Sequence, residues 1–239
     1  MGNGIYVALS GAVAQSDALD VTANNVANAS TVGFHAERVR FSQALTRASG
    51  NEMAFVTAKG GKTDASAGAL RTTEAPLDLA LAGDGYFAID TPRGVRYTRA
   101  GAFKLNDEGT IVNADGFAAR AQGGGSLQVP PGTQSIAVAE NGMVTADGVE
   151  IGALELSKFM PSALTREGSS LLIARGPATP IAEGDLKVVS GALEQANFNV
   201  VRGVMDLVRI SRSYEALHRM IESYREIDSR TARDVGGPG

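Results

Sequence analysis

The amino-acid sequence predicts an α+β fold, in which long N- and C-terminal helices form a coiled-coil-like terminal domain around a central antiparallel β domain. Near both ends of the chain, apolar or small side chains recur at the heptad spacing of packed helices. The middle of the chain alternates like strands and is interrupted by Asp-Gly and Asn-Gly turns. A chain of 239 residues can bury a core, and its 29 glycines favour many tight turns between short strands.

The first expected element is a helix over residues 4–28. Its seam alternates spacings of four and three residues, and it consists of Ile5, Leu9, Ala12, Ser16, Leu19, Ala23 and Val26. Alanine and serine side chains allow two helices to approach closely but bury little apolar surface. We therefore expect a helix that packs along a partner through a thin contact.

Asparagines cluster where this helix is expected to end. Asn24, Asn25 and Asn28 lower the helix propensity, but their amides can bond backbone groups at a helix terminus. Gly33 can then adopt a left-handed turn, and Phe34 can pack just beyond it. These five residues predict a joint that fixes the angle at which the chain leaves the helix. The alternative is an ordinary helix C-cap.

The next two segments differ in periodicity. Residues 37–75 are polar, rich in Ala, Gly and Thr, and weakly periodic, which predicts an extended connector. Residues 76–190 predict a β-rich domain, whose expected turns lie at Asp84-Gly85, Asp107-Glu108-Gly109, Asp115-Gly116, Asn141-Gly142 and Asp147-Gly148. Two stretches, DEGTIVNADGFA and ENGMVTADGVEI, resemble each other and suggest duplicated hairpins.

A second seamed helix is expected to begin at residue 200 and to end near Arg233. Its seam consists of Val200, Gly203, Leu207, Ile210, Tyr214, Leu217, Ile221 and Tyr224. We interpret the charged residues on its other face as solvent-exposed. The chain is thus divided into a terminal helical assembly domain of residues 1–36 and 191–239, a connector of residues 37–75 and a central domain of residues 76–190. Because the N-terminal seam is thin, we expect both ends to become fully ordered only beside neighbouring molecules.

Motifs that would support catalysis or metal binding are weak. The chain has no cysteine, which excludes disulfides and cysteine-based metal sites. Gly61-Lys62-Thr63 ends like a phosphate-binding loop, but Val56 stands where that motif requires glycine. His35 and His218 have no ligand or base partner at a useful spacing, so we expect surface or interface positions for them. The sequence therefore predicts no enzyme, catalytic residue, cofactor, metal site or small-molecule substrate.

Composition also narrows the possible partners. A net charge of −4 argues against general nucleic-acid binding, and an aromatic content of 5% argues against an aromatic cage. No stretch reaches the roughly 18 apolar residues of a membrane span. The N-terminal residues lack the pattern of a cleaved signal peptide, so we expect either a cytosolic location or export without a cleaved leader.

Three segments resemble the signatures of flagellar basal-body rod and hook proteins. They are ANNVANASTVGF at residues 23–34, the stretch of residues 76–116 that begins PLDLALAGDGYFAID, and SGALEQANFNVVRGVMDLVRISRSYE at residues 190–215. The third keeps the signature residues Gly191, Leu193, Glu194, Asn197, Asn199, Arg212, Tyr214 and Glu215. The chain departs from the family pattern at His35, where a basic residue is usual, and at Ala196 and Phe198, where serine and valine are usual.

The resemblance implies a structural subunit of the bacterial flagellar basal-body rod in the periplasm. In this family the terminal helices of many subunits pack into an inner tube that transmits torque, and the β domain faces outward. The implied partners are further copies, neighbouring rod proteins and the flagellar type III export apparatus. The length and the start IYVALSGA resemble proximal rod proteins, with a distal rod protein as the alternative. A secreted oligomeric β-rich binding module is a third possibility.

Overall fold

The computed structural model describes residues 3–48, 51–182 and 184–235, and it confirms the α+β fold. The chain divides into two compact units. The helical unit contains the described residues of Met1–Ala27, Glu37–Lys62 and Asn199–Gly239, and the β unit contains those of Asn28–Ala36 and Thr63–Phe198. Compared with the expected division, residues 28–36 and 191–198 therefore lie with the β domain, and residues 37–62 lie with the helices.

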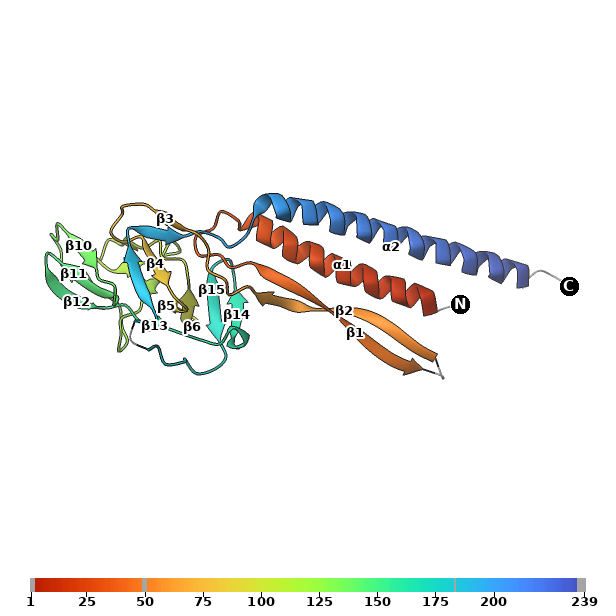
Figure 1. Ribbon diagram of the computed structural model, residues 1–239, viewed down its shortest axis with the longest axis horizontal. Coiled ribbons are helices and arrows are strands. Elements are labelled where there is room, and N and C mark those ends of the chain that lie inside the picture. The colour runs from red at the N-terminus through yellow and green to blue at the C-terminus, as the bar shows by residue number, and fades with distance from the viewer. Residues whose placement is uncertain (1–2, 49–50, 183, 236–239) are drawn as a thin grey trace. The chain divides into compact units, whose positions relative to one another are not determined.

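The helical unit is built on two long helices, α1 (Asn3–Ala27) and α2 (Val200–Val235), which run side by side (Figure 1). They are antiparallel, because Gly4 of α1 faces Tyr224 and Gly11 faces Leu217. Asn199 caps α2, since its side-chain oxygen accepts a hydrogen bond of 3.0 Å from the backbone N–H of Arg202.

Small side chains of α1 form the contact between these helices. Ala8 and Ala12 are buried against Ile221, and three partly buried side chains complete the cluster, namely Ile5, Tyr214 and Leu217. Of the predicted seam residues, Ile5, Ala12, Tyr214, Leu217 and Ile221 take part in this contact within one chain, and their part in assembly stays a prediction. Leu9 and Val200 do not follow this pattern, because their side chains are 50% and 46% exposed.

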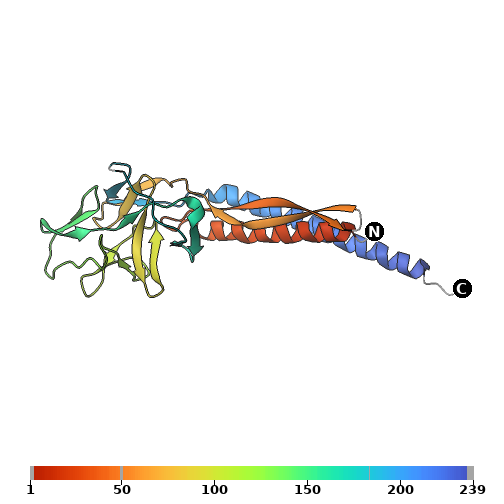
Figure 2. The ribbon, with the colours of Figure 1, turned by 90° about the horizontal axis from the view of Figure 1, so that it is seen from below.

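Strands β1 (Glu37–Ala48) and β2 (Asn51–Thr63) pair with each other and lie beside α1 (Figure 2). This regular structure differs from the extended connector that the sequence predicts for residues 37–75. Arg38 and Arg40 alternate with Val39 and Phe41, as in a strand, but the alternation stops at Gln43, so the pattern is too short to predict the strand pair. Gly61, Lys62 and Thr63 belong to β2, and the next element is a strand, so the structure offers no phosphate-binding loop there.

The β unit consists of short strands joined by tight turns. The strands are β3 (Leu70–Thr72), β4 (Leu79–Ala82), β5 (Tyr86–Thr91), β6 (Gly94–Thr98), β7 (Lys104–Leu105), β8 (Ile111–Val112), β9 (Ala118–Ala119), β10 (Ile136–Val138), β11 (Met143–Ala146), β12 (Val149–Ala153), β13 (Leu156–Ser157), β14 (Leu164–Glu167), β15 (Leu171–Ala174), β16 (Lys187–Ser190) and β17 (Ala192–Glu194), with a 3₁₀ turn at Pro161–Ala163.

These strands pair antiparallel. The largest sheet has the order β14-β15-β6-β5-β9-β8-β7, with β13 also on β5, and a smaller sheet has the order β10-β11-β12. Two further pairs, β16 with β4 and β17 with β3, join the late strands to the early ones. The described residues of this unit form a large apolar core and a smaller cluster of Tyr86, Phe159 and Leu172. The fully buried side chains of the large core include Leu79, Phe87, Ile89, Ile111, Leu127, Val144 and Val188.

The two similar stretches of sequence have the same local topology. DEGTIVNADGFA contributes β8 between β7 and β9, and ENGMVTADGVEI contributes β11 between β10 and β12. Their turns are not all of one kind. Asp147 and Gly148 both have positive φ, 49° and 81°, as a type I′ turn requires, whereas at Asn141-Gly142 only the glycine does, at 84°.

Candidate functional site

The asparagine cluster divides between the two units. Asn25 is buried in the helical unit, where its amide contacts Glu37 at two points. Its Nδ2 donates to the Glu37 carbonyl at 2.8 Å, and its Oδ1 accepts from the Glu37 N–H at 2.9 Å. The side chain thereby connects the last turn of α1 to the first residue of β1. Asn24 is exposed beside it.

The other three residues of the predicted joint lie in the β unit. The Asn28 carbonyl accepts from the Thr31 N–H at 3.0 Å. Gly33 has a φ of 63° and donates its N–H to the Glu194 carbonyl at 2.8 Å. Phe34 is fully buried, and the Arg166 guanidinium lies 4.4 Å from the centre of its ring. Each of these residues therefore has a local structural role. That together they fix the angle at which the chain leaves α1 stays a prediction.

A buried ion-pair cluster lies next to Phe34. Glu194 is fully buried, and its Oε1 is 2.9 Å from His35 Nε2 while its Oε2 is 3.1 Å from Arg99 Nη1. The Gly68 N–H donates to the same carboxylate at 2.9 Å. The guanidinium of Arg99 also donates to the carbonyls of Leu81 and Gly83. The cluster thus connects four distant parts of the β unit.

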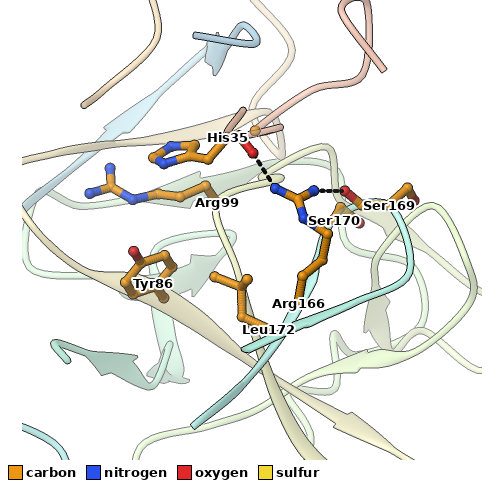
Figure 3. Close-up of a pocket in the computed structure, with 8 residues that line it drawn as sticks. His35, Tyr86, Arg99, Arg166, Ser169, Ser170 and Leu172 are labelled. Atoms are coloured by element: carbon orange, nitrogen blue, oxygen red, sulfur yellow. Dashed lines mark hydrogen bonds between the residues drawn. The ribbon is translucent and has the colours of Figure 1, made fainter. Parts of the chain in front are cut away.

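The expected surface position of His35 is wrong, because the side chain is only 5% exposed and binds Glu194. His218 is exposed, as expected, and stacks edge-on against Tyr214. No local sequence pattern signals the cluster, since His35, Arg99 and Glu194 lie far apart in the chain. In Figure 3, His35 and Arg99 lie side by side, and Arg166 bonds the carbonyl oxygens of His35 and Ser169.

Burial and the neighbouring charges shift the pKa values of the cluster in opposite directions. Burial raises the pKa of Glu194, but the hydrogen bonds from His35 and Gly68 and the charge of Arg99 outweigh it, so the pKa is lowered overall. Burial also raises the pKa of Tyr86, whose ring lies 5.4 Å from the Arg99 guanidinium carbon, although the charge of Arg99 opposes that rise. Two basic side chains and an amide thus hold the carboxylate ionised, and loss of one of these partners would leave a buried charge uncompensated.

The remaining seam residues belong to the helical unit. Leu19, Val26, Leu207, Ile210 and Tyr224 are partly buried. On the side of α1 that faces β2, these two elements form a groove of about 400 Å³. The described residues that line this groove include Tyr6, Leu9, Val13, Asp17, Phe55 and Val56.

Three family models match this chain in succession. The model of the flagella basal body rod protein matches residues 5–35, that of the flagellar hook protein FlgE/F/G D1 domain matches residues 80–146, and that of the C-terminal part of the flagellar basal body rod FlgEFG protein matches residues 189–234. The flagellar basal-body rod protein FlgF of Rhizobium meliloti is 32% identical, over 99% of both chains. The chain belongs to the flagellar basal-body rod protein family.

Other rod proteins are similar over most of their length. FlgF of Escherichia coli is 31% identical over 93% of this chain and 94% of its own. FlgG of Bacillus subtilis is 32% identical over 93% of this chain and 95% of its own. The first and last family matches fall on α1 and α2, so the features shared with other rod proteins include both long helices. As a family member, the chain is a structural protein of the flagellar basal-body rod.

The described residues of this rod protein contain no group of three or more His, Cys, Asp or Glu side chains arranged to hold a metal ion. Within the same residues, neither long helix is apolar enough over a sufficient length to cross a membrane.

Proposed function

We propose that this protein is a proximal-rod subunit that associates with further copies and with neighbouring rod proteins through its helical unit. The observation that carries the proposal is the end-to-end match to FlgF of Rhizobium meliloti, which spans 99% of each chain. The helical unit supports it, because exposed apolar side chains on both α1 and α2 remain available for contacts with other molecules.

Chain length favours the proximal over the distal rod. The alignments to the FlgF proteins of Rhizobium meliloti and Escherichia coli span 239 residues each, whereas those to FlgG proteins of Bacillus subtilis and Caulobacter vibrioides span 251 and 260. The FlgG alignments therefore contain more insertions relative to this chain than the two FlgF alignments do. Labelled electron microscopy of isolated basal bodies tests the assignment, and label at the outer end of the rod would favour the distal alternative.

We further propose that the subunit reaches the periplasmic rod through the flagellar type III export apparatus, without a cleaved leader. Membership of the rod family supports this route. Mass spectrometry of the protein in purified basal bodies tests it. We expect the N-terminal residues of the encoded chain to be present there, and a shortened N-terminus would contradict the proposal.

Deletion of residues 1–30 in the native bacterium separates the rod function from a secreted binding module. The deletion removes α1, and with it the partner of α2. We expect loss of motility and of rod assembly, although the β unit keeps its own core. Restoring the full chain provides the control, and normal motility of the deletion strain would contradict the proposal.

A further inference from the structure

The helical unit has an exposed apolar stripe at the start of α2. Its side chains are Val200, Val201, Val204, Met205 and Val208, which are between 46% and 70% exposed. They recur at i, i+1, i+4, i+5 and i+8, so they occupy one face of the helix. A second apolar surface of this unit is the groove between α1 and β2.

Within one chain, the α2 stripe and the α1–β2 groove face in different directions. α2 packs on α1 through Tyr214, Leu217 and Ile221. Val201, Met205 and Val208 of the stripe lie on the other side of α2, whereas Val200 borders the packed side. The groove lies on the side of α1 that faces β2, where Tyr6, Leu9 and Val13 are 58%, 50% and 55% exposed. Since α1 and α2 are already fixed by their seam, the stripe cannot enter the groove of its own chain.

The two surfaces carry opposite charge. α1 contains Asp17 and Asp20 but no lysine or arginine, and Asp17 is the one charged side chain among the described residues of the groove. Residues 200–212 of α2 contain Arg202, Arg209 and Arg212 against the single Asp206, a balance of 3 − 1 = +2. Contact between two grooves or between two stripes would bring like charges together, whereas contact between a groove and a stripe brings unlike charges together.

We propose that the α2 stripe of one copy packs into the α1–β2 groove of a second copy. This inference rests on the proposed function and specifies the surfaces through which copies associate. The contact is heterologous, so each added copy leaves one groove free at one end and one stripe free at the other, and the assembly can grow unless the rotation between copies closes it into a ring. Five side chains cover less than the roughly 800 Å² per partner of a standard interface. A single contact is therefore weak, and an array with additional contacts stabilises it.

The absence of cysteine allows a direct test by cross-linking. One full-length variant carries Val13→Cys in the groove, and the other carries Met205→Cys in the stripe. The purified proteins are mixed at high concentration and treated with a short bis-maleimide. We expect a covalent dimer in the mixture that is at least tenfold more abundant than in either protein alone. Circular dichroism of each variant verifies that the helices are intact.

A third variant, Val149→Cys, serves as the control, because this side chain is 67% exposed in the β unit and has no part in the proposed contact. A mixture of Val149→Cys and Met205→Cys should give only background dimer. Equal dimer in the Val13→Cys protein alone would overturn the heterologous contact. No specific dimer, despite concentration-dependent association in sedimentation, would overturn this contact and leave the rod function intact. Loss of association altogether would refute both the contact and the proposed self-association.

Discussion

The Arg99 guanidinium holds a carboxylate that has no contact with solvent. Replacing Arg99 by methionine keeps the length of the side chain but leaves Glu194 paired with His35 alone. Because one partner of a buried pair is removed, we expect the free energy of unfolding of the β unit to fall by about 3–5 kcal/mol. Urea denaturation of the full chain, followed by tyrosine fluorescence, measures the loss.

The matched control is an exposed ion pair in the same unit. Lys187 Nζ lies 2.7 Å from Glu140, and both side chains are more than half exposed. Lys187→Met should lower the free energy of unfolding far less than Arg99→Met does, because water already solvates the charges of an exposed pair. Equal losses in the two variants would mean that the cluster contributes no more than a surface contact.

Acid should weaken the β unit through Glu194. Its pKa is lowered on folding from the ordinary value of 4.5, so the unfolded chain takes up the proton more readily. The stabilisation is present above pH 4.5 and is lost as the pH falls from there through the folded-state pKa. The free energy of unfolding of the native chain should therefore decrease more steeply below that pH than that of Glu194→Gln. Parallel curves from urea titrations at several pH values would contradict the expectation.

Gly33 is restricted both by its backbone conformation and by its neighbours. Its φ is 63°, and an added Cβ would lie 2.3 Å from the Ala100 nitrogen. Gly33→Ala should therefore lower the free energy of unfolding by well over the roughly 1–2 kcal/mol that a left-handed conformation costs a residue with a Cβ. Gly116 also has positive φ, at 85°, but nothing lies within 4 Å of its added Cβ, so Gly116→Ala should cost only that amount. Similar thermal midpoints for the two variants would show that the surroundings of Gly33 yield without cost.

At the scale of elements, α2 offers two isoleucines in different surroundings. Ile221 is 6% exposed against Ala8 and Ala12, whereas Ile227 is 49% exposed. Ile221→Ala should destabilise the α1–α2 contact by about 2–4 kcal/mol, and Ile227→Ala by less than about 1 kcal/mol. Hydrogen exchange of the α1 amides measures the difference. Unchanged protection in Ile221→Ala would show that the thin seam does not hold the helices together.

The sequence predicted the helices well because their periodicity is local. The expected helix over residues 4–28 is observed as Asn3–Ala27, and the helix expected from residue 200 begins at Val200, although it extends to Val235. The β1–β2 pair was not predicted, because alternation is confined to the start of β1 and the rest of the pair forms through contacts between the two strands. The cluster of His35, Arg99 and Glu194 was also missed, since a contact between residues 159 positions apart leaves no local pattern.

At the scale of the whole molecule, association between copies should depend on salt. The acidic α1 and the basic start of α2 attract each other when copies approach, and dissolved ions screen this attraction over roughly 8–10 Å at physiological strength. We expect the sedimentation-derived association constant to fall severalfold between 50 mM and 500 mM NaCl, as salt weakens surface electrostatics. Asp17→Asn should reduce this dependence. An association constant that rises with salt throughout would indicate a purely apolar contact.

Two hydrogen bonds join the start of the β unit to its end. The Gly33 N–H donates to the Glu194 carbonyl at 2.8 Å, and the Asn197 N–H donates to the Phe34 carbonyl at 3.2 Å. The β unit is made of two chain segments, Asn28–Ala36 and Thr63–Phe198, and these bonds attach the short first segment to the last residues of the second. A fragment that begins after Ala36 therefore loses both bonds together with the buried Phe34.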